Sequence, residues 1–115
     1  MNGPFVVDGT LVARLETFFA ETAAATGRSL IAMEPEGDAA VAERAGGTVV
    51  YMGPGMFLNR AFALGVSEPA GPEAVDFVVD FFAARERVAE IELCPYAHDA
   101  VRARAAEGLR ARLVP

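Results

Sequence analysis

The most constraining stretch of this sequence is TVVYMGPGMFLNRAFALGV, residues 48–66. The β-branched and aromatic residues from Thr48 to Met52 favour a strand, and Gly53-Pro54-Gly55 supplies a turn directly after it. A second apolar run follows from Asn59 to Val66. Two such runs joined by a turn are predicted to pair as an antiparallel hairpin, so a sheet must be part of the fold.

A helix is predicted before this hairpin, with Asp8 or Thr10 as its cap and Gly27 as its stop. The segment that follows, Ser29 to Met33, favours a short strand, and Asp38 to Arg44 is ambiguous between helix and strand, so the structure of the stretch from Arg28 to Ala45 is left open. Gly46-Gly47 then supplies a turn where positive φ is expected. The apolar positions at helical spacing in the first helix are Leu11, Leu15, Phe18, Phe19 and Thr22.

The second half of the chain alternates helical and strand patterns. A helix is predicted from Pro72, a strand over Glu90–Cys94, a short helix over Asp99–Glu107 and a strand over Leu109–Val114. The chain is therefore predicted to be one α+β domain over residues 1–115, a mixed sheet with helices on its faces. The predicted core includes the stripe Val75, Val78, Val79 and Phe82 and the phenylalanines Phe18, Phe19, Phe77 and Phe81.

Charge and composition exclude several classes of function. The formal net charge of −6 and the lack of a basic stripe argue against nucleic-acid binding. The apolar runs are too short to cross a bilayer and the N-terminus has no basic leader, so we predict a cytoplasmic protein without membrane contact. One cysteine leaves no internal disulfide, and a cysteine-based metal site is not expected.

Three segments carry a family resemblance: GPGMFLNRAFALG, then DFFAARERVAEIELCPYA, then AAEGLR, all between residues 48 and 112. In this order they resemble the N-terminal half of two-domain GNAT-family N-acetyltransferases, where a Gly-Pro turn, an Asn-Arg-Ala run, a Phe-Phe helix and a Glu-Leu-Cys-Pro strand end recur. The resemblance implies a GNAT-like sheet, truncated after its last strand. It also implies that the complete protein transfers an acetyl group from acetyl-CoA to an amine, for which a small-molecule amine is one candidate.

The junction that should bind the cofactor departs from the family pattern. In the family, a loop of the form Arg/Gln-x-x-Gly-x-Gly/Ala offers backbone amides to the pyrophosphate. Here the junction is Val66 to Pro72, in which two prolines lack N–H groups and Glu68 repels phosphate. We therefore expect acetyl-CoA to bind the complete protein, and no cofactor to bind this chain alone.

Three hypotheses follow from the resemblance. In the first, the chain is a non-catalytic N-terminal half or fragment, whose partner is a second GNAT-like domain. In the second, it is a self-standing, non-catalytic GNAT-like module that forms a homo-oligomer or binds another protein. In the third, it is a small complete acyltransferase with an atypical cofactor loop.

Asn59 and Arg60 are the candidate substrate-binding residues, because they interrupt an apolar strand entry in the best-matching segment. Arg60 suits a carboxylate or phosphate, and Asn59 suits a substrate amide. The alternative is that Asn59 binds the backbone of the turn and Arg60 pairs with a carboxylate of this chain or of the missing half.

The remaining polar candidates are weaker. Glu90 and Glu92 share one strand face, either as paired carboxylates for general base chemistry or as a solvated face. Cys94 and His98 are close enough in sequence for a reactive pair, but a buried thiol and a helix-capping or exposed histidine are the simpler interpretation. Tyr51 and Tyr96 are the two tyrosines, and no catalytic role is assigned to either.

Overall fold

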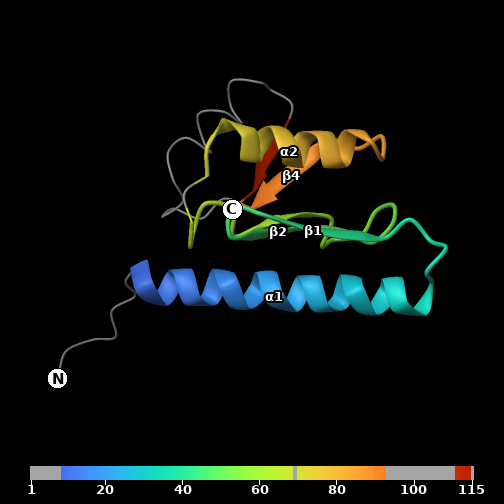
Figure 1. Cartoon of the computed structure of the whole chain (residues 1–115), viewed down its shortest axis with the longest axis horizontal. Helices are drawn as coiled ribbons and strands as arrows, with labels where there is room; N and C mark the ends of the chain where they lie inside the picture. The colour runs from blue at the N-terminus through green and yellow to red at the C-terminus, as the bar shows by residue number, and fades with distance from the viewer. Residues whose placement is uncertain (1–8, 69, 93–110, 115) are drawn as a thin grey trace.

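The computed structural model describes residues 9–68, 70–92 and 111–114. Within them, two helices enclose a mixed sheet, so the chain has an α+β fold (Figure 1). The sheet has the strand order β1-β2-β3-β4-β5; the first three strands are antiparallel, and β4 is parallel to both β3 and β5. The elements are α1 (Gly9–Met33), β1 (Ala40–Arg44), β2 (Gly47–Tyr51), β3 (Arg60–Phe62), α2 (Pro72–Ala83), β4 (Ala89–Glu92) and β5 (Ala111–Val114).

The two helices lie on opposite faces of the sheet (Figure 1). Strand β2 is buried along its whole length, and its side chains alternate between the two helices. Val49 and Tyr51 belong to the cluster that packs under α2, together with Val78, Phe82 and Ile91. On the other face, a second cluster contains two alanines of α1, one residue each of β2 and β3, and the residue that directly follows each of these strands: Ala20, Ala23, Val50, Met52, Phe62 and Ala63.

Arginine side chains cover phenylalanine rings on the α2 face. The guanidinium of Arg44 lies 4.1 Å from the centre of the Phe77 ring, and that of Arg85 lies 4.0 Å from the centre of the Phe81 ring. Both rings are partly buried and pack against the core. These contacts place positive charge over ring faces, where it is attracted by the ring electrons.

Several predictions are confirmed. The hairpin forms through the antiparallel pairs Thr48↔Phe62, Val49↔Ala61 and Val50↔Arg60. Helix α2 starts at Pro72, and its predicted stripe of Val75, Val78, Val79 and Phe82 is buried. The predicted alternation in β4 is observed, with Ala89 and Ile91 buried between half-buried glutamates. The predicted helix at Asp99–Glu107 and the end of the predicted strand at Leu93–Cys94 lie outside the described residues.

The prediction that Gly27 ends the first helix is wrong. Helix α1 continues to Met33, which also removes the predicted strand over Ser29–Met33 and places Thr10 inside the helix instead of at a cap. Gly27 is buried against the sheet, and a Cβ there would lie 2.6 Å from Cγ2 of Val41. The glycine therefore allows close packing of α1 on the sheet. In the remainder of the ambiguous stretch, β1 pairs with β2 through a turn at Ala45 and Gly46, both with positive φ.

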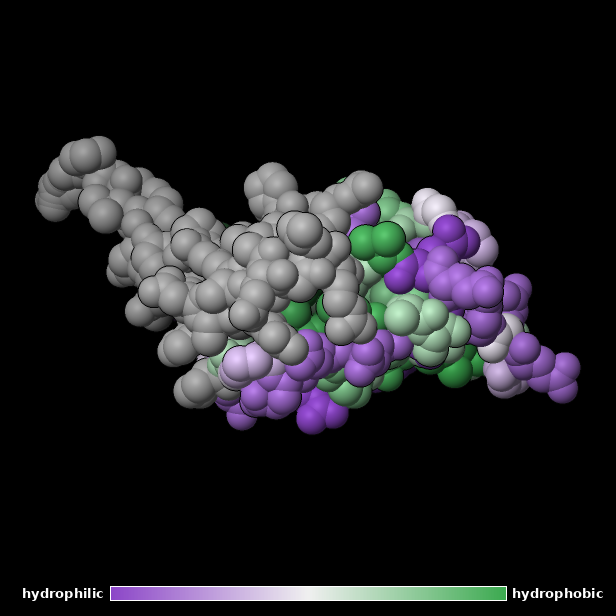
Figure 2. Space-filling model, turned by 90° about the horizontal axis from the view of Figure 1, so that it is seen from above, coloured by the Kyte–Doolittle hydropathy of each residue, from purple (hydrophilic) through white to green (hydrophobic). Residues whose placement is uncertain are grey.

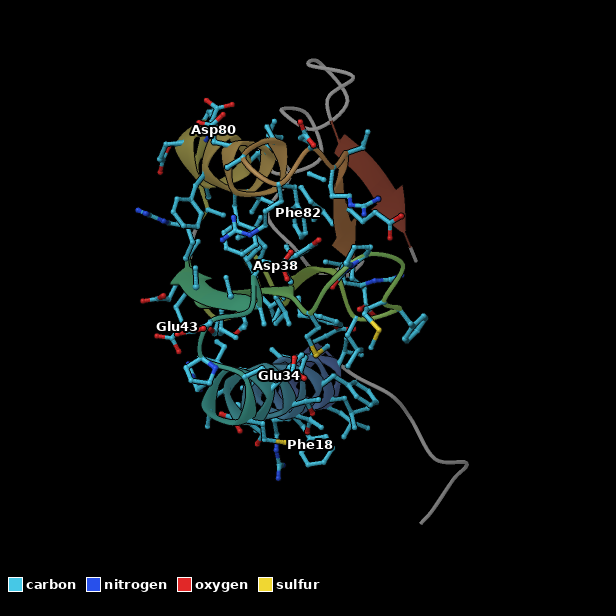
Figure 3. All side chains as sticks on the ribbon, turned by 90° about the vertical axis from the view of Figure 1, so that its right-hand side faces the viewer. Phe18, Glu34, Asp38, Glu43, Asp80 and Phe82 are labelled. Atoms are coloured by element: carbon cyan, nitrogen blue, oxygen red, sulfur yellow. The ribbon has the colours of Figure 1, made fainter. Side chains whose placement is uncertain are left out.

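The prediction that Phe18 and Phe19 belong to the core is also wrong. Their exposed fractions are 61% and 54%, and Leu15 is 47% exposed. Figure 3 shows Phe18 pointing from α1 away from the sheet. The helix meets the sheet mainly with alanine and glycine, together with the partly buried Leu30, whereas Leu15, Phe18 and Phe19 lie on the outer side. Phe82 of α2 points into the core.

The surface on the α2 side combines hydrophilic and hydrophobic areas. Seen from above, hydrophilic side chains gather toward the right-hand side of the molecule, and hydrophobic side chains are visible in the middle (Figure 2). In the described part of the chain, neither helix has the length and hydrophobicity of a membrane span.

The packing at Gly27 gives a testable prediction. In an open helix position, Gly→Ala stabilises by about 1 kcal/mol, but overpacking costs about 1–3 kcal/mol. We expect Gly27→Ala to lower the free energy of unfolding by about 1 kcal/mol in urea titrations, because the new methyl group meets the Val41 side chain. In a Val41→Ala background the same substitution should be neutral or stabilising, and the exposed Ser29→Ala serves as the control. Stabilisation by Gly27→Ala alone would contradict this packing.

Candidate functional site

The loop between β2 and β3 is held by the side chain of Asn59. Its Oδ1 accepts a hydrogen bond from the backbone N–H of Met52 at 2.7 Å, and its Nδ2 donates to the carbonyl of Gly53 at 2.5 Å. The amide of Asn59 therefore bridges the two ends of the Gly-Pro-Gly loop, which corresponds to the local role considered from the sequence. Its use toward a substrate amide stays a prediction.

Arg60 lies at the start of β3 and pairs with a carboxylate on the neighbouring parallel strand. Its Nη2 is 3.3 Å from Oε2 of Glu90, and the two side chains are only 14% and 28% exposed. The ring of Phe57, itself 76% exposed, lies with its centre 4.8 Å from the guanidinium carbon. The Nε of Arg60 is buried and has no hydrogen-bond partner in the described part of the chain. A charge-assisted pair of this kind holds the guanidinium in one orientation.

A small hollow of about 150 Å³ lies beside this pair. Its lining combines the loop, the end of α2 and the start of β4. Met56, which is half exposed, and Val88, which is 67% exposed, give it apolar walls beside Asn59 and Glu90. The structure thus brings the two predicted residues, Asn59 and Arg60, close to a hollow with an apolar rim and an ion pair, which suits a small ligand with both apolar and polar parts.

The two glutamates of β4 have different partners. Glu90 pairs with Arg60, whereas Glu92 lies near Glu16 of α1. Burial, and secondly the negative charge of Glu92, raises the pKa of the Glu16 carboxyl above its ordinary value. The sequence interpretation missed Glu16, although its spacing from Ala20 and Ala23 marks it as a polar residue on the inner face of the helix.

A second hollow, of about 330 Å³, lies between α1 and the turn that joins β1 to β2. Three carboxylates line it, from Glu21, Glu43 and Glu68, together with the backbone around Gly46. The guanidinium of Arg44, the basic residue of this lining, is stacked on Phe77 of α2. A hollow with this set of charges favours a cation over an anion.

The N-terminus of α2 is the place where a phosphate group would be expected to bind. Gly71 is the N-cap residue, Pro72 follows it, and no side chain caps the helix. The carboxylate of Glu73 already occupies this end, since a Cβ on Gly71 would lie 2.5 Å from Oε2 of Glu73. This carboxylate would repel a pyrophosphate, and proline provides no N–H donor. The residues at this junction do not fit the phosphates of acetyl-CoA.

The other polar candidates do not join this site. Tyr51 is buried in the core, with 2% of its surface exposed. Cys94, Tyr96 and His98 lie outside the described residues. Within the ranges 9–68, 70–92 and 111–114, no three His, Cys, Asp or Glu residues are arranged so that they could hold a metal ion.

Comparisons with family models, with curated proteins and with solved structures find no significant match to this chain.

The bridging role of Asn59 can be measured as stability. Asn59→Ala removes both hydrogen bonds of the loop and leaves the Met52 N–H and the Gly53 carbonyl unpaired, so it should lower the free energy of unfolding by about 2 kcal/mol. Asn59→Asp keeps an acceptor for the Met52 N–H but turns a carboxylate oxygen toward the Gly53 carbonyl, so it should cost at least as much as Asn59→Ala. Urea titrations compare the three proteins. If Asn59→Ala unfolds at the same urea concentration as the wild type, the bridge does not hold the loop.

Glu16 predicts a pH dependence of stability. Because the pKa of Glu16 is raised in the folded state, the folded chain holds this proton to higher pH than the unfolded chain. Stability therefore falls as pH rises from about 4, the ordinary value for Glu, through the raised pKa, and stays lower above it. Glu16→Gln cannot ionise, so it should be more stable than the wild type at pH 7.

Thermal unfolding of both proteins between pH 3 and pH 7 measures this effect. The advantage of Glu16→Gln should disappear at about pH 3, where the wild-type carboxyl is protonated in both states. Glu34→Gln, in the exposed turn after α1, should change stability by less than about 0.5 kcal/mol at either pH. An advantage of Glu16→Gln that is equal at both pH values would contradict the assignment.

Proposed function

We propose that this chain is the N-terminal, non-catalytic half of a GNAT-family N-acetyltransferase, acting in the cytoplasm. In the complete protein, an acetyl group would pass from acetyl-CoA to a small-molecule amine, and a second GNAT-like domain would hold the cofactor. This chain would shape the acceptor side and pack against that domain. The proposal starts from the resemblance of residues 48–112, and features of the fold support it.

The first support is the unit β3-α2-β4. The helix connects two parallel neighbouring strands, and these strands share a single registered pair, Ala61↔Ile91. Pairing limited to one position is consistent with strands that diverge beyond it, which is the feature used by acetyltransferases to admit their cofactor. The antiparallel meander before this unit is also consistent with the resemblance.

The observation that carries the non-catalytic assignment is the blocked N-terminus of α2. Glu73 places a carboxylate where the cofactor phosphates would need backbone N–H donors, and Pro72 removes one donor. Glu68 precedes the helix in sequence, but its carboxylate lies beside Gly46, in the hollow next to α1. A chain with this junction has lost the anion-binding device on which cofactor binding in such a fold depends.

The charged hollow beside α1 is consistent with an amine as the acceptor. Of its three glutamates, Glu43 is ion-paired with Arg28, and the carboxylates of Glu21 and Glu68 are the charges that would attract a protonated amine and repel acidic compounds. No catalytic role is proposed for them.

A second function is favoured by one specific observation, the exposed apolar side of α1 around Phe18 and Phe19. Exposed phenylalanines next to each other indicate a surface that is covered by another protein. This favours the self-standing, non-catalytic GNAT-like module that forms a homo-oligomer or binds a partner.

Cofactor binding separates these functions. A ligand that binds only the folded state raises the stability of that state. Because the 115-residue chain is not expected to bind acetyl-CoA, its thermal unfolding should be unchanged at a saturating concentration of acetyl-CoA. The complete product of the gene should be stabilised by acetyl-CoA and should acetylate members of an amine panel. Stabilisation of the 115-residue chain would overturn the non-catalytic assignment. If the complete product neither binds acetyl-CoA nor transfers acetyl groups, the self-standing, non-catalytic binding module is the function that remains.

A further inference from the structure

The outer side of α1 carries a regular seam of uncharged residues. Starting at Leu11, the seam residues follow at alternating spacings of four and three, the pattern of a helix that packs on another helix. Leu15 and Phe18 are about half exposed or more, and the rest of the seam after Leu11 is exposed as well. The seam consists of Leu11, Leu15, Phe18, Thr22, Ala25, Ser29 and Ala32.

The polar groups of this seam are already satisfied within the helix. The hydroxyl of Thr22 donates to the carbonyl of Phe18 at 2.9 Å, and the neighbouring Thr26 donates to the carbonyl of Thr22 in the same way. Thr22 therefore has no free donor hydrogen, and its methyl group can contribute to an apolar contact. In Figure 3, the side chain of Phe18 extends from this side of α1, opposite the sheet.

Charged residues lie along one border of the seam, and a binding partner would have to match their charges. Arg14, Glu21 and Arg28 each precede a seam residue by one position, seven residues apart. Arg28 is paired with Glu43 at 3.5 Å. Within the described part of the chain, no ion pair engages Arg14 or Glu21. The border therefore offers one positive and one negative charge, two turns apart, on an exposed helix surface.

We propose that this seam binds the same seam of a second copy of the chain, with the two α1 helices antiparallel about a two-fold axis between residues 16 and 17. In this register Leu15 of each copy packs on Phe18 of the other, and Leu11 packs on Thr22. The border residues of antiparallel helices face each other, so Arg14 of each copy meets Glu21 of the other. The contact thus has complementary charges on one border and Phe19 with Val12 on the opposite one.

Other arrangements of two copies lack this complementarity. In a parallel pair, each border charge would face the opposite border five residues further along, where Phe19 and Thr26 provide no charge. An antiparallel pair shifted toward the C-terminus would need Arg28, which is already paired with Glu43, and would bury mainly small residues. Only the register around Leu15 and Phe18 joins the largest apolar side chains with Arg14 and Glu21, the two border charges that have no ion pair within residues 9–68, 70–92 and 111–114. The register is argued from α1 alone and does not require acetyl transfer, but it shares Glu21 with the lining of the hollow beside α1.

Sedimentation velocity of the 115-residue chain tests the proposal. A contact between two single helices is a small interface, for which weak affinity is expected. The chain should therefore be loaded at concentrations from about 10 µM to about 1 mM. The average mass is expected to rise from 12.1 kDa toward twice that value. The substitution Phe18→Glu should weaken association by about tenfold or more. Because Phe18 is exposed, the substitution should leave the fold intact. Met33→Glu is the matched control, because Met33 is exposed on the same helix outside the contact and should change nothing.

Charge exchange tests the register. Arg14→Glu should weaken association, since two like charges would then face each other across each border, and the double variant Arg14→Glu with Glu21→Arg should restore it. Circular dichroism confirms that each variant is folded. A mass of one chain at every loading would overturn the proposal, as would a dimer that Phe18→Glu leaves unchanged. Failure of the double variant to restore association would overturn the antiparallel register.

Discussion

The fold depends on a strand that has no solvent-facing side. All five residues of β2 are buried, so successive side chains must find apolar partners on opposite faces of the sheet. Val49 and Tyr51 can be covered only by α2, and Val50 only by α1. Burying a valine is worth about 1.5–3 kcal/mol, and leaving one face open would lose several such contributions. The two-sided burial of β2 is therefore what requires both helices.

The same constraint limits the backbone around β2. At its first residue, Gly47, a Cβ would lie 2.5 Å from the carbonyl oxygen of Phe62 and 2.8 Å from the backbone nitrogen of Leu64. No rotation of a side chain can relieve a contact with backbone atoms, so this position requires glycine. At its C-terminal end, β2 leads into the loop that Asn59 bridges. The candidate site at Arg60 is thus positioned by the packing of the sheet and not by the loop alone.

Sequence patterns predicted α2 and the β2–β3 hairpin because their signals are local. A valine and phenylalanine stripe after Pro72, and a Gly-Pro-Gly turn between apolar runs, have the same meaning in many contexts. The first helix was misjudged for a physical reason. Its contact with the sheet uses Ala20, Ala23 and Gly27, and small residues carry little periodic signal, whereas the large apolar residues that dominate the pattern lie outside.

In the candidate site, too, the local features were predictable from the sequence and the long-range contacts were not. Asn59 and Arg60 were recognisable as polar residues in an apolar run, and the local hydrogen bonds of Asn59 follow from its place in a turn. The partner of Arg60 was not predictable, because Glu90 lies thirty residues away and meets it only through the parallel pairing of β3 and β4. The proximity of Glu16 to Glu92 likewise depends on how a helix crosses the sheet.

The stacking of Arg44 on Phe77 and of Arg85 on Phe81 has a consequence for how the molecule behaves in concentrated solution. Each planar guanidinium covers a ring that is only partly buried, so a charged group faces the solvent where an aromatic face would otherwise do so. Lysine presents a compact ammonium group and cannot lie flat on a ring in the same way. In a chain whose basic residues are all arginine, the choice of cation thus contributes to colloidal stability as well as to charge.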